Sequence, residues 1–433
     1  MANNLPPTPP HLPLAGVRIA DFSWFGAGPI ATKILADHGA EVIRFESQGH
    51  LDGLRIAQPI ADSKTGNLNC SGYYNNFNSS KLSLFLNLSK PQSREIIWRL
   101  LKVSDVAVEN FSPRVMEGWG LTYAEASQVK PDIIWADQPM QGLRGPHKYY
   151  AGFGATITPL GGLAYLMGFP HRPPLGTGTN YTDYVINPGH LAIAILAALR
   201  YRRRTGQGQH IEMSQFESAV TILEAALREY PANGRVPQRP GNRLPYAAPH
   251  GVYRCRGEER VVTYLAERGP VSERKAERWV ALAVFTDAEW QGFCSALGNP
   301  AWAGDERFAT LAGRKAHEDE LDQHIQGWTA QRTAEEAMHL LQARGVAAGV
   351  VQDAEDTLKH DPHLRARGYY QYLNHPEAGQ TAYDGPPFRL SRTPVALRRH
   401  APLLGEHTEY ICKELLGFSD DEIGQLVVDG VLE

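Results

Sequence analysis

The sequence predicts an α/β fold whose core is a parallel sheet covered by helices. Short apolar runs typical of buried strands recur through the first half of the chain, and they alternate with segments of helical periodicity. The first two runs are separated by a glycine-rich turn and a helical segment. At 433 residues the chain is longer than one compact domain needs, so we expect two domains.

The amino-terminal unit contains the most informative pattern. Apolar runs at 17–22 and 41–45 predict two strands. Between them, Gly26 and Gly28 permit a tight turn, and Pro29 suits the first helical position. This spacing is typical of nucleotide-binding units and predicts a phosphate-bearing ligand.

The glycine turn has three interpretations. Gly26, Gly28 and Ala31 match the dinucleotide-binding fingerprint in its alanine-ending form, and Glu46 lies near the distance at which an acid binds a ribose hydroxyl. Two details count against a nicotinamide cofactor: the turn opens late after the strand, and Pro29 removes a backbone donor to a pyrophosphate. Another phosphate-bearing ligand and a purely structural turn are the alternatives.

Further elements continue the alternation through the first half. They are a helix at 90–103, a strand at 105–108, a short helix after Ser112, a strand at 132–136, a segment at 209–213 and a helix at 214–230. Residues 145–188 are rich in glycine, proline and aromatic residues and are expected to form a functional loop region. Residues 189–204 are apolar on every face and then basic, which predicts a buried helix with Gly206 as its cap.

The second half has a different organisation. A segment at 231–249, rich in proline, glycine and arginine, is expected to be a linker into a separate domain at 250–350. That domain is expected to contain strands at 260–265 and 279–285, and amphipathic helices after Asp287 and Thr333. The remaining expectations are a flexible, proline-rich leader at 1–12, a second linker at 351–386, and helices at 406–416 and 420–428.

Composition excludes several classes of function. The net charge of −4 gives no electrostatic footprint for nucleic acid. The four cysteines have no metal-ligand spacing, so we expect free thiols in a reducing compartment and no bound metal. No segment is expected to reach the length of a membrane span, and the amino-terminal residues lack the features of a signal peptide. We therefore expect a cytoplasmic protein without a membrane or nucleic-acid partner.

Asp183 is the leading candidate for chemistry. It precedes the expected buried helix, and a helix amino terminus favours a charged carboxylate by about 0.3 to 1 kcal/mol. The alternative is a capping group with no chemical role. His190 is a candidate base or a core histidine, and the arginine-rich run at 200–204 fits a helix end as well as a phosphate site.

Seven segments occur in the order found in one known family. They are Pro-Leu-Ala-Gly-Val-Arg at 13–18, Ala-Gly-Pro at 27–29, Asp-His-Gly-Ala-Glu-Val-Ile at 37–43, Val-Glu-Asn-Phe at 108–111, Arg-Thr-Gly-Gln-Gly-Gln at 204–209, 279–290, and Gly-Glu-His at 405–407. In these segments, which span almost the whole chain, the sequence resembles the class III coenzyme A transferases of the CaiB/BaiF type. This group contains formyl-CoA and carnitine CoA transferases and alpha-methylacyl-CoA racemase.

The resemblance implies that Asp183 is the catalytic nucleophile. The family's aspartate precedes an alanine- and leucine-rich helix that ends at Arg-Thr-Gly-Gln-Gly-Gln, and Asp183 fills that place, although the interval to Thr205 is slightly longer than usual. The implied reaction moves coenzyme A from an acyl-CoA thioester to a free carboxylic acid through an aspartyl anhydride and an aspartyl-CoA thioester. Coenzyme A is thus expected as a substrate, with no prosthetic group, and water must be kept out.

The resemblance also implies contacts to coenzyme A. They are Trp24, Gly26, Ala27, Leu86, Ser89, Asn110, Phe111 and Ser112. The chain departs from the family at Ser47 and Ser89, where relatives have basic residues, and Lys90 is a candidate replacement for the second. A charged insertion at 256–278 stands where some members have a glycine-rich lid.

The family fold implies how the domains are built. It consists of a large Rossmann-like parallel-sheet domain, assembled from both chain ends, and a small α+β middle domain. On this chain the large domain comprises 13–230, which binds coenzyme A, and 387–433. Two chains are expected to form an interlocked homodimer with active sites at the subunit interface.

Two other functions compete with the transferase. An acyl-CoA racemase of the same fold would need a base where this chain has Gly152-Phe153, and phenylalanine cannot move a proton. A noncatalytic CoA-binding protein would not need Asp183. The donor and acceptor acids are not identified by the residues; resemblance to succinyl-CoA-using members favours short dicarboxylates such as succinate and malate.

Overall fold

The structure is a computed structural model that describes residues 12–258, 261–264, 272–395 and 397–433. The chain forms two compact units. The large unit comprises Met1–Tyr165, Leu175–Pro237 and Pro362–Glu433, and the small unit comprises Leu166–Pro174 and Gln238–Asp361. Both ends of the chain therefore fall in the large unit.

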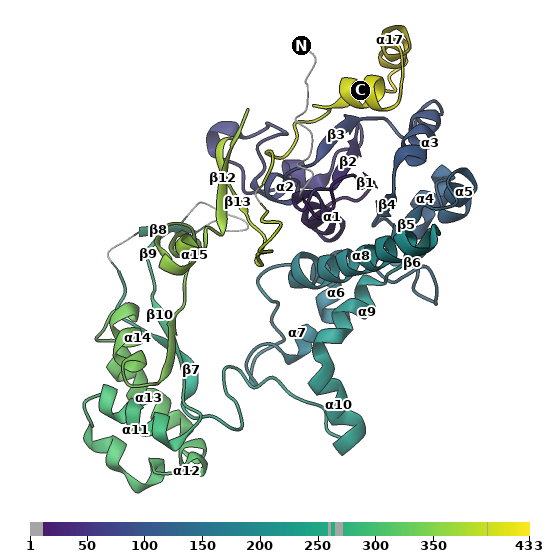
Figure 1. Ribbon diagram of the computed structural model, residues 1–433. Helices are drawn as coiled ribbons and strands as arrows, with labels where there is room; N and C mark the ends of the chain where they lie inside the picture. The colour runs from purple at the N-terminus through teal and green to yellow at the C-terminus, as the bar shows by residue number, and fades with distance from the viewer. Residues whose placement is uncertain (1–11, 259–260, 265–271, 396) are drawn as a thin grey trace. The chain divides into compact units, whose positions relative to one another are not determined.

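A six-stranded parallel sheet forms the centre of the large unit (Figure 1). Its strand order is β3-β2-β1-β4-β5-β6, and every neighbouring pair is parallel. The strands are β1 (Arg18–Asp21), β2 (Glu41–Glu46), β3 (Leu82–Phe85), β4 (Val106–Glu109), β5 (Ile134–Asp137) and β6 (Gln209–Glu212). This is a doubly wound order that reverses between β1 and β4, and ligands of such sheets bind beyond the carboxyl ends of the strands at that point.

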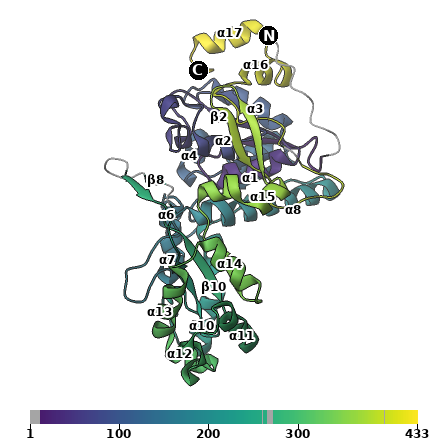
Figure 2. The same cartoon turned by 90° about the vertical axis from the view of Figure 1, so that its left-hand side faces the viewer.

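Side chains along each strand point alternately to the two faces of the sheet. Because both faces carry apolar side chains, helices cover both of them. Helices α1 (Ala27–Asp37) and α8 (Asn187–Thr205) pack on one face, against Ile19, Val106 and Ile134 among others. The opposite face, which holds Trp135, is covered by α3 (Ser93–Val103), α5 (Tyr123–Val129) and α17 (Asp420–Val428). In Figure 2, α3 and α17 lie above β2, and α1 and α8 lie below it. The expected parallel sheet covered by helices is confirmed, and the carboxyl end of the chain contributes to its core.

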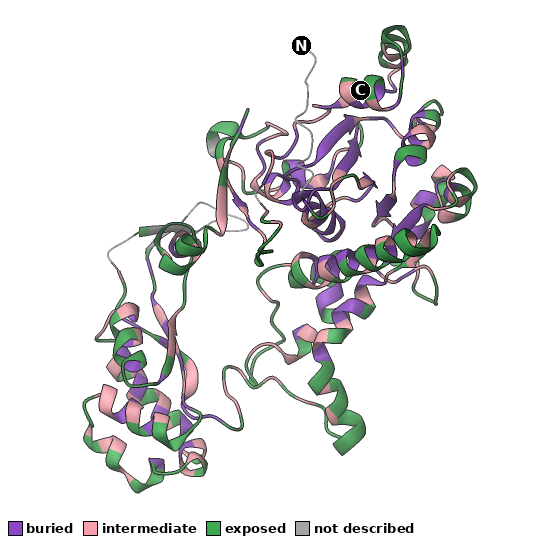
Figure 3. Ribbon diagram, in the orientation of Figure 1, coloured by how far each residue is buried: buried purple, intermediate pink, exposed green. Residues whose placement is uncertain are grey.

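Two expectations about helix α8 are wrong. It is not buried on every face, since buried and exposed residues alternate along it (Figure 3). Leu191 and Ile195 are fully buried, whereas Ile193 is 67% exposed and Leu196 is 43% exposed. The sheet covers only one side of the helix, which explains the difference. The continuous helical segment Thr182–Thr205 also has the length and hydropathy of a membrane span, contrary to expectation, but 44% of its apolar window is buried in this protein.

Shorter elements complete the large unit. They are α2 (Gly72–Phe77), α4 (Pro113–Trp119), α6 (Gly154–Leu160), α7 (Leu163–Leu166), α9 (Gln215–Val220), α10 (Glu224–Asn233), α15 (Pro362–Arg367), α16 (Thr408–Tyr410) and the antiparallel hairpin β12 (Tyr370–His375) and β13 (Gly379–Asp384). The hairpin lies within 351–386, where the sequence predicts a linker. It packs against α2, so this segment is part of the folded unit.

The small unit combines an antiparallel sheet with helices. Its sheet has the order β11-β10-β7, and its core is closed by helices on one side. The elements are β7 (His250–Arg254), β10 (Trp279–Ala283), β11 (Ala347–Val350), α11 (Asp287–Ala296), α12 (Leu311–Ala316), α13 (Glu318–Thr329) and α14 (Ala334–Gln342). Strands β8 (Val261–Tyr264) and β9 (Ser272–Lys275) pair with each other; the rest of the strand expected at 260–265 and most of the expected leader lie outside the described residues.

Candidate functional site

Hydrogen bonds connect the turn after β1 to the residue after β4, at the point where the strand order reverses. The side chain of Asn110, directly after β4, donates to the carbonyl oxygen of Trp24 at 2.8 Å and accepts from its N–H at 2.9 Å. Gly28 is required here because a Cβ at that position would lie 2.3 Å from the Cβ of Ser23. Pro29 is the third residue of α1, not the first as expected. It still lies in the first turn of the helix, where the backbone N–H groups have no partner within the helix, so proline is tolerated there.

Phe25 adopts a backbone conformation that is unusual for a bulky residue. Its φ is 63°, in the left-handed region. Its N–H donates to both carboxylate oxygens of Asp52, at 3.2 and 3.3 Å, which holds the strained turn in place. Such strain persists only where surrounding contacts enforce it, and it is concentrated at functional sites.

Asp183 lies beside this turn. It belongs to the π-helical turn Thr182–Ile186 that leads directly into α8, and it is 8% exposed. Its Oδ2 accepts the backbone N–H of Gly154 at 2.7 Å, whereas Oδ1 is buried and has no hydrogen-bond partner among the described residues. A Cβ at Gly26 would lie 3.5 Å from the Cβ of Asp183, so the glycine turn and the carboxyl group are in close contact.

The environment of Asp183 makes its charged form less favourable. Burial raises the pKa of this carboxyl, and the N–H of Gly154 and the side chain of Asn187 only partly oppose the effect. The sequence predicts stabilisation of the charged form by a helix amino terminus, whereas in the structure burial is the first cause acting on the pKa of Asp183 and it raises that pKa. Asn187 is itself held by Gln215 at 3.2 Å and Ser218 at 2.6 Å. A buried carboxylate with one oxygen fixed and the other unpaired is a candidate reactive group.

A cavity of about 250 Å³ opens at the carboxyl ends of β1 to β4. Its lining is mostly apolar and consists of Phe22, Trp24, Phe45, Glu46, Ser47, His50, Leu86, Leu88, Phe111, Val115 and Trp119. Three of the residues expected to contact coenzyme A, namely Trp24, Leu86 and Phe111, line this cavity. It lies at the position where doubly wound sheets bind nucleotides.

The other expected contacts lie elsewhere around the turn. Gly26 faces Asp183 and Tyr184, and Ala27 is 3% exposed within α1. The hydroxyl of Ser89 donates to Asn87 at 2.6 Å, and Ser112 is the N-cap residue of α4. The amide of Asn110 is occupied by the backbone of Trp24.

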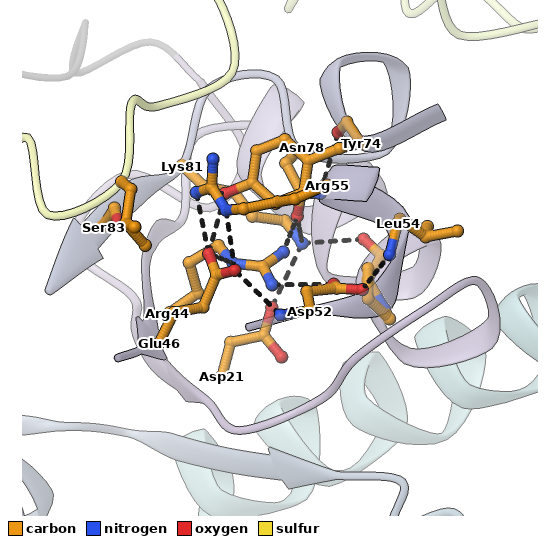
Figure 4. A network of polar contacts seen from close by, with 12 residues as sticks. Asp21, Arg44, Glu46, Asp52, Leu54, Arg55, Tyr74, Asn78, Lys81 and Ser83 are labelled. Atoms are coloured by element: carbon orange, nitrogen blue, oxygen red, sulfur yellow. Dashed lines mark hydrogen bonds and ion pairs between the residues drawn. The ribbon is translucent and has the colours of Figure 1, made fainter. Parts of the chain in front are cut away.

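A buried network of charged residues supports the same turn (Figure 4). Glu46 accepts from Arg55 at 2.7 and 2.8 Å and pairs with Arg44 at 3.3 Å. Burial alone would raise the pKa of Glu46, but Arg44 and Arg55 outweigh it and hold the pKa below its usual value. The carboxylate of Glu46 is therefore already bound by Arg44 and Arg55 and is not available to a ribose hydroxyl. This counts against the dinucleotide interpretation of the glycine turn.

Lys81 extends this network to the end of β1. Its ammonium group contacts Asp21 at 3.1 Å and the carbonyl oxygen of Pro29 at 2.9 Å. Burial lowers the pKa of Lys81 to about 8. The sequence did not lead us to expect roles for Arg44, Arg55 and Lys81. Arg44 alone could have been noticed, because it is a charged residue inside a segment that otherwise predicts a buried strand.

The remaining candidates have structural contacts. His190 is exposed, and its Nδ1 lies 3.1 Å from the carbonyl oxygen of Ile186. Arg202, from the basic run, pairs with Asp105 at 2.6 Å and with Asp132, which ties the end of α8 to the sheet. In the part of the chain that the structure describes, no group of three or more His, Cys, Asp or Glu residues is arranged to hold a metal ion.

Comparison with known proteins places these features in one family. The family described as CoA-transferase family III matches residues 14–272 and 270–408. The chain is 31% identical to a succinyl-CoA–D-citramalate CoA-transferase of Chloroflexus aurantiacus, over 98% of this chain and 99% of that protein. It is 30% identical to a formyl-CoA:oxalate CoA-transferase of Rhodopseudomonas palustris, over 97% of each protein. A crystal structure of a CAIB/BAIF family protein from Brucella suis is similar with a TM-score of 0.81 and 29% identity, covering 93% of this chain and 99% of that chain.

Proposed function

Because this chain belongs to CoA-transferase family III and is an enzyme of that class, we propose that it transfers coenzyme A between carboxylic acids through covalent intermediates on Asp183. One observation carries the proposal: Oδ2 of Asp183 is held by the N–H of Gly154, while Oδ1 is buried without a hydrogen-bond partner in the part of the chain that the structure describes, and the Cβ of Asp183 lies close to Gly26. This arrangement orients a carboxylate and leaves one oxygen to form a bond.

The reaction proceeds in four exchanges at acyl carbons. The ionised Oδ1 of Asp183 attacks the thioester carbonyl of acyl-CoA, and the coenzyme A thiolate leaves, which gives a mixed anhydride. The thiolate then attacks the aspartyl carbonyl and releases the donor carboxylate, which gives an aspartyl-CoA thioester. An acceptor carboxylate displaces the thiolate to form a second anhydride. Attack of the thiolate on the acceptor's acyl carbon gives the new acyl-CoA and restores Asp183, with no net change in protons or electrons.

The cavity at the carboxyl ends of β1 to β4 provides the seat for coenzyme A. Its volume of about 250 Å³ lies just below the roughly 300 to 1,000 Å³ of sites that enclose a whole small molecule, so it accommodates one ring system of the coenzyme. Trp24 lines this cavity, and Gly26, two residues later, faces Asp183. The proposed nucleotide seat and the nucleophile thus lie on the two sides of one turn. Gly26, Ala27, Ser89, Asn110 and Ser112 remain proposed contacts to the rest of the coenzyme.

A racemase function is not favoured. Position 153, where that function would need a base, holds a phenylalanine whose ring contacts Phe25 with centroids 4.9 Å apart. His190, the nearest histidine to Asp183 in sequence, is exposed and contacts the backbone of its own helix. Neither residue supplies acid or base chemistry next to Asp183.

An interlocked homodimer in the cytoplasm is part of the proposal. The exposed face of α8 includes the apolar residues Ile193 and Leu196, and it continues from the turn that holds Asp183, where Val185 is also exposed. A second chain that covers this face would also exclude water from the reactive anhydride. The four cysteines are all unpaired and buried, which is consistent with a reducing compartment.

Substitution of the nucleophile tests the proposal. We expect Asp183→Ala to abolish coenzyme A transfer from succinyl-CoA or acetyl-CoA to any acid in a panel of carboxylates, measured by mass spectrometry, while the dimer stays folded. Asp287→Ala, which removes an exposed aspartate from the first turn of α11, is the matched control and should retain full activity. Trapping with hydroxylamine after incubation with acyl-CoA alone should modify the peptide that contains Asp183. Retention of more than a few per cent of turnover in Asp183→Ala would contradict the assignment.

A further inference from the structure

Two Phe-Gly pairs adjoin the side chain of Asp183. They are Phe25-Gly26 in the turn after β1 and Phe153-Gly154 at the start of α6. A Cβ at Gly26 would lie 3.5 Å from the Cβ of Asp183, and a Cβ at Gly154 would lie 2.8 Å from its Oδ2. Both glycines therefore contact Asp183 directly, and each phenylalanine is one residue away from that contact.

The two phenylalanine rings meet each other. Their centroids are 4.9 Å apart and the ring planes are inclined by 62°, an edge-to-face contact. Phe153 is 52% exposed, although it adjoins a buried carboxyl group. Phe25 is held rigidly by its left-handed backbone and by the carboxylate of Asp52. These two rings, which we call the aromatic wall, belong to the residues that precede the two glycines lying against Asp183, and the ring of Phe153 is accessible.

A further aromatic cluster lies beside Gly26, and polar groups, the N–H of Gly154 and the side chain of Asn187, also act on Asp183. The ring of Tyr184 packs on Phe77 at 5.3 Å and on Tyr73 at 6.1 Å, and a Cβ at Gly26 would lie 3.0 Å from its Cε1. Among the described residues, no lysine, arginine or histidine forms an ion pair with Asp183, whose hydrogen bond comes from the N–H of Gly154. A second carboxylate on the substrate would need a cation or several hydrogen-bond donors when it is taken out of water.

We propose that the acid exchanged at Asp183 has an aromatic or bulky apolar body, which packs on the ring of Phe153, and does not carry a second carboxylate. This inference rests on the proposed role of Asp183 as the nucleophile. The proposed acid differs from the short dicarboxylates, such as succinate and malate, that the sequence resemblance favours. The carboxyl end of the substrate reacts at Asp183 while its apolar body covers the exposed ring, which buries apolar surface and excludes water from the anhydride.

Competing acids provide the test. With acetyl-CoA as donor, we expect kcat/KM for 3-phenylpropionate to exceed that for succinate at least tenfold. Phe153→Ala should lower kcat/KM for 3-phenylpropionate at least tenfold and leave kcat/KM for propionate within about threefold of wild type, because a missing ring affects only the acid that packs on it. Phe388→Ala is the matched control, since this phenylalanine is 48% exposed in the large unit and packs on His38.

A charge substitution gives an independent readout. Phe153→Arg places a cation on the exposed wall and should reverse the preference toward succinate, with little effect on folding because the side chain is half exposed. Preference of the wild type for succinate, or an equal effect of Phe153→Ala on all acids, would overturn the inference. Transfer to succinate with full dependence on Asp183 would leave the proposed function standing, whereas absence of transfer to every acid would overturn that function itself.

Discussion

The side chain of Asn110 and the backbone of Trp24 form a reciprocal pair of hydrogen bonds, at 2.8 and 2.9 Å, across the reversal of strand order between β1 and β4. The two residues are 86 positions apart in the sequence. Trp24 lines the proposed seat for coenzyme A, and the turn that follows it contacts Asp183. We therefore expect Asn110 to influence coenzyme A binding through the position of Trp24, in addition to the contact proposed for Asn110 itself.

Removal of this pair should weaken coenzyme A binding. Two hydrogen bonds of about 0.5 to 1.5 kcal/mol each position Trp24, so Asn110→Ala should raise the Kd for coenzyme A about tenfold or more, measured by calorimetric titration. Asn233→Ala is the control, because that amide donates to Glu229 within α10 and is exposed. An unchanged Kd in Asn110→Ala would show that Trp24 is held without it or does not bind the coenzyme.

Gly154→Ala should impair catalysis more than binding. The added Cβ would lie 2.8 Å from Oδ2 of Asp183, so the carboxylate must move from its position. A displacement of about 1 Å can cost roughly 100-fold in rate, and we expect a fall in kcat of that order with the Kd for coenzyme A unchanged. Gly189→Ala in α8, which has nothing within 4 Å of the new Cβ, should retain wild-type turnover. Equal activity of the two variants would show that Asp183 tolerates the shift.

Asp183→Asn should not destabilise the protein at neutral pH. Because burial raises the pKa of Asp183, the native state binds its proton more tightly than the unfolded state. The contribution to stability is complete below the ordinary aspartate pKa of about 3.9 and is lost as the pH rises through the higher pKa of the native state. As the pH rises through the native-state pKa of Asp183, the free energy of unfolding should fall less in Asp183→Asn than in wild type. Urea unfolding at a series of pH values measures this difference. A clear loss of stability in the variant at neutral pH would contradict this account.

Glu46→Gln should destabilise the large unit strongly. The substitution leaves Arg44 and Arg55 buried without their shared anion, and removal of one partner of a buried ion pair costs about 3 to 5 kcal/mol. Glu95→Gln is the matched control: Glu95 pairs with Arg99 on the surface, where the expected loss is below about 1 kcal/mol. Chemical denaturation measures both. A similar small loss in the two variants would show that the buried network contributes little to stability.

The exposed face of α8 should be covered by a second chain. Leu196→Asp places a charge on this apolar face and should convert the proposed homodimer to monomer, as measured by analytical ultracentrifugation, whereas Asp421→Lys on the exposed surface of α17 should not. If the dimer is interlocked, tagged and untagged dimers should not form mixed dimers when they are incubated together under native conditions. Rapid exchange would show an ordinary interface between two faces.

Local chemistry made many helices and strands predictable. The expected helix 420–428 agrees with α17 at both ends, because Ser419 and Glu422 form a capping box at its start. The glycine after α8, Gly206, adopts a φ of 74° as a carboxyl cap, as expected from the sequence. The hairpin Tyr370–His375 and Gly379–Asp384 was not predictable in this way, because its strands are stabilised by pairing with each other and by packing on α2.

By itself, the sequence determined the parallel α/β class, the family and the candidate nucleophile Asp183, because periodicity, glycine turns and ordered motifs are local properties of the chain. Only the tertiary structure decided what surrounds that aspartate. The bond from Gly154 to Asp183 joins residues 29 positions apart, and the contact of Lys81 with Asp21 joins residues 60 positions apart. Burial, the pKa shifts and the aromatic wall at Phe153 all depend on such distant pairs, since a side chain loses its water only when other segments fold against it.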